Sequence, residues 1–377
     1  MSSRSKPSGR PDRKLEERDF TGGGIIGAPE FVGSTGDPDM DAQVSELVRK
    51  WDCTKSPALI EELLVTALNI GHDDIGVGDL KLLNRSLKEL RSAMLGFRPY
   101  RHHRKVVVYG SARTDPEQPE FKAAMALSQT MLRHGFWTIT GAGEGIMGAA
   151  QKGAGRDQSF GLNIRLPFEQ SANETIHGDS KLHYFNYFFT RKLTFVKEAD
   201  AVALFPGGFG TMDECFEVLT LMQTGKMQIL PIVMVDAPGG TYWKTFLQFV
   251  KDHLLRLELI SPQDLHFFKI TDQLDEAVEE ICGFYRVFHS YRFVGSRLVL
   301  RLENRITRKA LDRINEEFGD LLKKGKFELK KALKAEANEP NIANLPRIVF
   351  TPLLKNFGRF RQLIDALNAA ETEEKET

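Results

Sequence analysis

The stretch that decides the fold runs from Ala201 to Glu214 and reads AVALFPGGFGTMDE. Its short apolar run is typical of a buried strand, and it passes through a glycine-rich loop into the helical pattern ECFEVLTLMQ. Similar runs occur before and after it, namely VVVY, FWTIT, SFGLNI and ILPIVMV, with amphipathic stretches between them. This alternation predicts an α/β fold in which helices cover both faces of a Rossmann-like, doubly wound parallel sheet.

Glycine-containing loops follow three of these runs. Ligands of such sheets bind beyond the carboxyl ends of the strands, and glycines let backbone N–H groups approach an anion at the start of a helix. The candidate phosphate-binding residues are Gly110 and Ser111 in the first loop, Gly141 and Gly143 in the second, and Gly207, Gly208, Gly210 and Thr211 in the third. The second loop, GAGEGIMG, has dinucleotide-type spacing but lacks the later acidic residue, and no Walker sequence is present. A mononucleotide is therefore favoured.

The third loop also carries a family resemblance. Its PGGFGTMDE, together with Arg191 and Lys192 upstream, resembles the PGGxGTxxE motif and Arg-Lys pair of the LOG family. The resemblance covers about residues 104–282. It implies a cytokinin riboside 5′-monophosphate phosphoribohydrolase, an activity often mislabelled lysine decarboxylase. No lysine that would bind pyridoxal can be located, so decarboxylation is discounted.

The chemistry of such an enzyme assigns two catalytic residues. Breaking a glycosidic C–N bond builds positive charge on the ribose, so a carboxylate beside the sugar is required. Glu214, in the first turns of a helix whose dipole favours its ionised form, is the candidate, and the alternative is a residue that only complements the dipole. The resemblance makes Arg191 the second catalytic residue; a surface ion pair or dimer contact is the alternative.

Further substrate contacts are expected beside these residues. By resemblance they are Glu174, Lys192, Phe209, Asp213 and Thr220. Thr220 could instead face the core, and Lys192 could instead form a surface ion pair or a dimer contact. Phe209 replaces the tyrosine common in the family, which leaves the preferred base open. The runner-up function is a non-catalytic nucleotide sensor or carrier.

Metals and cofactors are not expected. His177, His183 and His289 have no ligand spacing, and Cys215 without a nearby histidine base is interpreted as a small core residue rather than a nucleophile. The three cysteines lie far apart and predict no disulfide framework.

Composition and the pattern of apolar residues predict how the rest of the chain is organised. Lys plus Arg and Asp plus Glu are both 51 in 377 residues, so no global charge recruits nucleic acid or a membrane, and a cytoplasmic location is expected. We expect a disordered arm (1–40), a helical N-terminal region (41–103), the nucleotide-binding domain (104–283) and a C-terminal α+β addition (284–377). In this addition we expect a short β element and helices through TRKALDRINEEFGDLLKKG and GRFRQLIDALNAA. The helix after the third loop is apolar on several faces, which, with the family resemblance, predicts a homodimer or larger homo-oligomer.

Overall fold

The computed structural model describes residues 33–53, 56–167 and 171–373. These residues fall into two compact units, one ending at Arg91 and one beginning at Ser92. Most of the predicted disordered arm, residues 1–32, lies outside the described residues.

The first unit is helical. It contains α1 (Pro38–Lys50), α2 (Pro57–His72) and most of α3 (Val77–Phe97). Helix α1 begins three residues before the predicted boundary because Asp37 caps it, accepting hydrogen bonds from the backbone N–H groups of Asp39 and Met40.

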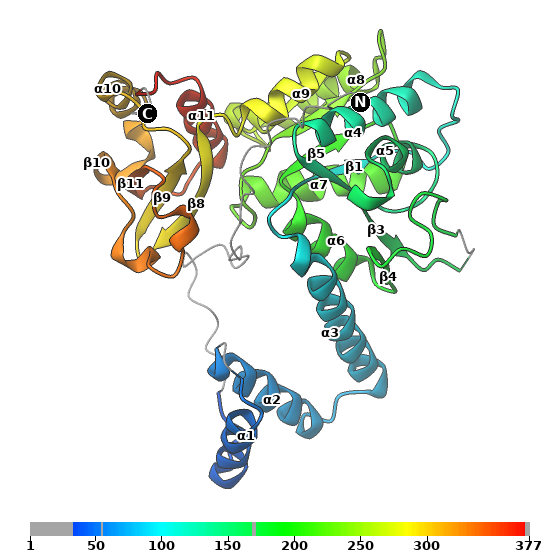
Figure 1. Cartoon of the computed structure of the whole chain (residues 1–377), viewed down its shortest axis with the longest axis vertical. Helices are drawn as coiled ribbons and strands as arrows, with labels where there is room; N and C mark the ends of the chain where they lie inside the picture. Colours follow the sequence, from blue (N-terminus) through cyan, green and yellow to red (C-terminus); the bar gives the residue numbers. More distant parts are fainter. Residues whose placement is uncertain (1–32, 54–55, 168–170, 374–377) are drawn as a thin grey trace, which may run out of the picture. The chain divides into compact units, whose positions relative to one another are not determined.

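The second unit is built on a seven-stranded sheet whose strands all pair in parallel (Figure 1). Its strands are β1 (Arg104–Tyr109), β2 (Phe136–Thr140), β3 (Ser159–Ile164), β4 (Leu182–Phe185), β5 (Ala201–Leu204), β6 (Ile232–Val235) and β7 (Phe268–Thr271). They lie in the order β4-β3-β2-β1-β5-β6-β7. Five of them are the predicted runs, whereas the edge strands β4 and β7 were not predicted.

Helices cover both faces of this sheet. One face, which includes Val106 and Val108, packs against α4 (Pro119–Arg133), α5 (Ile146–Ala154) and α9 (Leu274–Gly283). The other face, which includes Val107, packs against α6 (Phe188–Glu198), α7 (Phe209–Gln223) and α8 (Tyr242–Phe249). The fully buried strands explain the continuous apolar runs in the sequence, and the predicted doubly wound Rossmann-like fold is confirmed.

The C-terminal addition is larger than the short β element that the sequence suggested. Strands β8 (Phe288–Val294), β9 (Arg297–Leu302), β10 (Leu322–Lys330) and β11 (Arg347–Pro352) form an antiparallel sheet in the order β10-β11-β9-β8. It is accompanied by α10 (Arg308–Glu317) and α11 (Phe357–Asn368). The helix expected through TRKALDRINEEFGDLLKKG ends at Glu317, and the residues from Leu322 onward form a strand instead.

Helix α11 joins this addition to the α/β part. The Arg361 guanidinium on α11 donates to the Glu280 carboxylate on α9, and the Phe357 ring packs where Gly225 leaves room just after α7. Part of the apolar surface around α7 is therefore covered within the chain, which was the alternative to a partner subunit. The homodimer stays a prediction.

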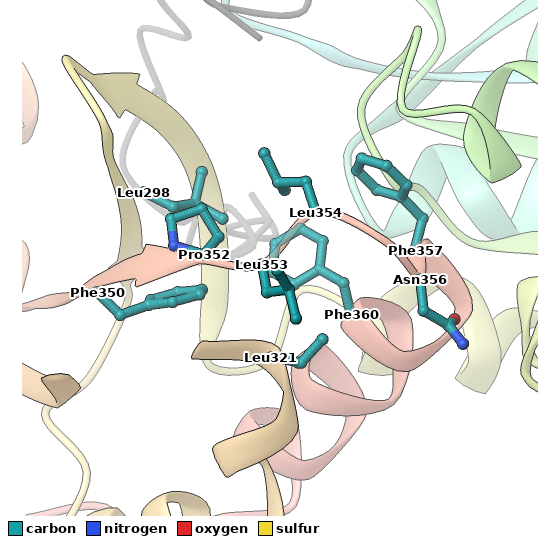
Figure 2. Close-up of a pocket in the computed structure, with 9 residues that line it drawn as sticks. All are labelled: Leu298, Leu321, Phe350, Pro352, Leu353, Leu354, Asn356, Phe357 and Phe360. Atoms are coloured by element: carbon teal, nitrogen blue, oxygen red, sulfur yellow. The ribbon is translucent and has the colours of Figure 1, made fainter. Parts of the chain in front are cut away.

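A small apolar cavity lies between α11 and the C-terminal sheet (Figure 2). Leu298, Phe350 and Phe360 are among the side chains that point into it. Its volume of about 10 Å³ is close to the minimum for a single water molecule, so it is a packing gap and not a nucleotide site.

No helix in the described ranges is long and apolar enough to cross a membrane.

Candidate active site

A cavity of about 790 Å³ opens where the sheet order reverses direction. Strands β1 and β5 are neighbours there, and the loops that follow them, Tyr109–Arg113 and Gly208–Thr211, line the cavity together with Arg191 and Glu214. Ligands of open α/β sheets bind at this topological switch point, and the volume lies within the range of about 300–1,000 Å³ typical of small-molecule sites.

The third loop presents an open helix N-terminus to this cavity. Gly208 is the N-cap of α7, and among the described residues no side chain caps the helix. A Cβ added at Gly208 or at Gly210 would meet no described atom within 4 Å. Because the first N–H groups of a helix have no intrahelical acceptor and carry a partial positive charge, α7 offers a ready anion-binding position at the cavity wall.

The second loop does not offer such a position, because the first loop occupies the N-terminus of α5. The Ile146 N–H donates to the Ser111 carbonyl oxygen at 3.0 Å, and the Ser111 N–H donates to the Pro206 carbonyl at 3.1 Å. Gly145 has a φ of +62°, and a Cβ there would lie 2.3 Å from that same Ser111 oxygen. The glycines of the first two loops therefore serve close packing between loops.

Three further glycines make room for specific side chains. Added Cβ atoms would lie 2.6 Å from Ile146 at Gly110, 2.3 Å from the Arg191 guanidinium at Gly141, and 2.6 Å from Met147 at Gly143. All three glycines line the cavity, and these contacts explain why a side chain is excluded there.

Glu214 lies on the first turns of α7 with its carboxyl group buried. Within the described part of the chain, its Oε2 has no hydrogen-bond partner. Burial raises the pKa of this carboxyl to about 7, although the cations of Lys192 and Arg191 act in the opposite direction. A buried acceptor that accepts no hydrogen bond is costly, which is typical of groups kept for a ligand.

Arg191 reaches the same cavity from α6. Its Nε donates to the Leu162 carbonyl oxygen at 2.7 Å, which anchors the guanidinium at the end of β3. Burial lowers the pKa of Arg191, and the neighbouring Glu214 raises it. The guanidinium remains a cation because its ordinary pKa is above 12.

Lys192 takes a different direction from Arg191. Its ammonium lies 2.9 Å from the Glu217 Oε2, 3.0 Å from the Asp213 Oδ2 and 3.6 Å from the Glu214 Oε2. Lys192 is not among the residues that line the cavity in the described chain. The structure therefore places this predicted substrate ligand within a cluster of acidic residues on α7.

The other predicted residues divide into two groups. Most line the cavity: Gly110, Ser111, Gly141, Gly143, Gly208, Phe209, Gly210, Thr211 and Asp213. Gly207, in the third loop, is not among the lining residues, and its carbonyl accepts a hydrogen bond from the Tyr242 hydroxyl at 2.7 Å. Glu174 and Thr220 are exposed and are not among the lining residues, so this structure does not bring them to the site.

Several lining residues were missed by the sequence. They include Tyr109 at the end of β1, Asn163 and Ile164 at the end of β3, Met147 on α5 and Phe188 at the start of α6. Tyr109, Asn163 and Ile164 stand at the carboxyl ends of predicted strands, a position that could have identified them. Phe188 has no such signal, since it joins the site only through the fold.

Cys215 directly follows Glu214 on α7. Cys215 is buried, and burial raises the pKa of its thiol to about 12, so it stays protonated and inert as a nucleophile at neutral pH. Within residues 33–53, 56–167 and 171–373, no group of three or more His, Cys, Asp or Glu residues could hold a metal ion.

Part of the chain is similar to known proteins. Residues 147–281 match the family described as possible lysine decarboxylase. The chain resembles the LOG family, as its motifs predict.

Curated relatives are similar over part of the chain. A probable cytokinin riboside 5′-monophosphate phosphoribohydrolase of Oryza sativa subsp. japonica is 27% identical over 164 residues, which are 42% of this chain and 63% of that protein. A cytokinin riboside 5′-monophosphate phosphoribohydrolase of Arabidopsis thaliana is 31% identical over 91 residues, 24% of this chain and 41% of that protein. The chain thus spans less than two thirds of the length of these relatives.

Two solved structures are also similar. The molybdenum cofactor binding protein of Rippkaea orientalis is 18% identical, with 46% of this chain and 91% of that chain covered and a TM-score of 0.33. The molybdenum cofactor carrier protein of Chlamydomonas reinhardtii is 15% identical, with 46% and 94% covered and a TM-score of 0.32.

Proposed function

We propose that this protein binds a nucleoside 5′-monophosphate and hydrolyses its N-glycosidic bond, releasing the free base and ribose 5-phosphate. One observation carries the proposal. The open N-terminus of α7 and the buried carboxyl group of Glu214, whose Oε2 accepts no hydrogen bond from the described residues, line the same cavity. A non-catalytic nucleotide carrier would need the first feature and not the second.

The phosphate is assigned to the first turn of α7. The backbone N–H groups of Phe209, Gly210 and Thr211 lie at the positive end of the helix dipole, and the Thr211 hydroxyl adds a side-chain donor at the same wall. Glu214 follows Phe209 by five residues, or about 8 Å along the helix axis. That separation suits a carboxylate beside the sugar of a nucleotide whose phosphate lies at the helix end.

The reaction needs charge stabilisation at the ribose. As the bond from C1′ to the base nitrogen breaks, positive charge develops on the ring, and an ionised Glu214 stabilises it from its buried position on α7. A water oxygen then bonds to C1′, one of its protons goes to the departing base, and the other completes the new hydroxyl. Arg191, held by the Leu162 carbonyl, contributes a fixed positive charge for the phosphate or for the orientation of Glu214.

The alternative role for Glu214 is to complement the helix dipole without taking part in catalysis. Its burial argues against that role, because a carboxylate that serves the dipole alone gains about 0.3–1 kcal/mol and is best left in solvent. The raised pKa of Glu214, about 7, shows the cost of its position.

The test is a product analysis. Purified full-length protein is incubated with AMP, GMP, CMP and UMP, and free base and ribose 5-phosphate are quantified. We expect equal amounts of the two products from at least one of these nucleotides. Tight binding of a nucleotide that is recovered intact would favour the sensor or carrier function and overturn the proposed hydrolysis.

A further inference from the structure

We propose that Lys192 is a positioning residue, which keeps Glu214 ionised and oriented for catalysis, and that it does not bind the substrate. This inference rests on the proposed function, since it concerns how Glu214 is made competent. It departs from the role that the Arg-Lys pair suggests, in which both side chains contact the nucleotide.

The geometry separates the two members of the pair. Arg191 lines the cavity and is anchored to the Leu162 carbonyl, whereas the Lys192 ammonium lies among the carboxylates of Asp213, Glu214 and Glu217. The Lys192 side chain is only 13% exposed. A lysine that is satisfied by carboxylates at 2.9 and 3.0 Å has little capacity left for a phosphate.

The charges around Glu214 show why this lysine is needed. The groups that face its carboxyl group are Tyr109 from β1, Arg191 and Lys192 from α6, and Asp213 and Glu217 from α7 itself. The site thus holds three carboxylates against two cations. Without Lys192, the two neighbouring carboxylates would face Glu214 with only Arg191 to balance them, and a buried carboxyl group in that setting takes up a proton.

The direction of the effect follows from these contacts. The Lys192 cation lowers the pKa of Glu214, while burial, Glu217 and Asp213 raise it. Removing the cation therefore raises the pKa further above its ordinary value, so a smaller fraction of Glu214 is ionised at neutral pH. Each unit of increase reduces the ionised fraction on the acid side about tenfold.

The experiment compares pH profiles of kcat/KM for AMP between pH 6 and 9.5. We expect Lys192→Met to move the acid limb upward by about one unit, so that activity falls about fivefold at pH 7 and about tenfold at pH 6, while activity at pH 9 approaches that of the wild type. Lys192→Arg should restore most of the wild-type profile. Glu217→Gln, which removes a neighbouring negative charge, should move the limb in the opposite direction.

A second measurement separates positioning from binding. Calorimetry with ribose 5-phosphate at pH 9 should give the same affinity for wild type and Lys192→Met within about twofold, and circular dichroism checks that the variant is folded. The proposal is overturned if Lys192→Met loses the same fraction of activity at every pH, or if its affinity for ribose 5-phosphate falls tenfold or more at pH 9.

Glu214→Gln distinguishes failure of this inference from failure of the proposed function. If that variant is inactive and the acid limb of Lys192→Met is unshifted, only the role of Lys192 is wrong. If Glu214→Gln hydrolyses AMP like the wild type, both the catalytic assignment and this inference are wrong.

Discussion

The second and third glycine loops differ in what occupies the N-terminus of the helix that follows each of them. Both connect a buried strand to a helix, and both contain several glycines. The N-terminus of α5 is filled by the backbone of the first loop, through the hydrogen bond from Ile146 to Ser111. The N-terminus of α7, at Gly208, faces the cavity and has no side-chain cap among the described residues.

This difference shows that glycine spacing alone does not identify a phosphate site. A glycine can be required because another part of the protein packs against it, as at Gly145, or because a ligand approaches there, as we propose for Gly208. Substitutions at these two positions should therefore have different consequences, one for folding and the other for binding.

The largest effect is expected in the second loop, where the first loop occupies the N-terminus of α5. Gly145→Ala combines a positive φ with a Cβ that would meet backbone atoms of Ser111 and Ala112, so we expect a loss of unfolding free energy of about 3 kcal/mol or more, measured by urea denaturation. The matched control is Gly135→Ala, where φ is also positive but nothing described lies within 4 Å. Equal losses for the two variants would mean that the loops do not pack as closely as the structure indicates.

A substitution in the third loop should change the affinity for AMP and not the stability of the fold. Gly208 has a negative φ and space for a side chain, so Gly208→Val should fold normally, yet its branched side chain would stand where the phosphate must approach. We expect affinity for AMP to fall about 100-fold, since about 3 kcal/mol of charge-assisted hydrogen bonding is lost. Gly319→Val, at an exposed position with similar space, is the control. Unchanged AMP affinity in Gly208→Val would place the phosphate at another loop.

A smaller effect on AMP binding is expected at Tyr242, whose hydroxyl contacts the third loop. The Tyr242 hydroxyl holds the Gly207 carbonyl at 2.7 Å, and Tyr242 is partly exposed. Tyr242→Phe should weaken AMP binding by about threefold, near the lower end for one lost hydrogen bond. Tyr184→Phe, another partly exposed tyrosine, should have no effect; a tenfold change in Tyr242→Phe would show that the hydroxyl acts on more than the backbone of the loop.

The sequence predicts the sheet well where strands are buried on both faces. Strand β5 is entirely buried and apolar, and its pattern is unmistakable. Strand β4, in contrast, is a four-residue edge strand with Tyr184 exposed, so its residues lack the apolar continuity that marks a central strand. Strand β10 was mistaken for the end of a helix because Leu322 to Gly325 continues a charged, helix-like sequence beyond Glu317.

The site is predictable to the extent that a local motif encodes it. Glu214 and the α7 N-terminus lie within one continuous segment, and the structure places them in one cavity. The directions of Arg191 and Lys192 are not encoded in this way, because neighbouring residues on a helix point about 100° apart and only the packed fold determines what each one meets. Phe188 reaches the cavity from the start of α6, so no local spacing reveals it, whereas Asn163 is signalled only by its position near the end of β3.

The most direct test of the account compares AMP turnover by wild type and Glu214→Gln at pH 8, with adenine and ribose 5-phosphate separated by chromatography. The amide retains the size of the side chain but not the charge that stabilises the ribose cation, and it removes the carboxyl group whose pKa is about 7. We predict that wild type releases both products in equal amounts, whereas Glu214→Gln binds AMP within about threefold of wild-type affinity and turns it over at least about 1,000-fold more slowly. Wild-type turnover by the variant, or intact AMP recovered from the wild-type protein, would contradict the account.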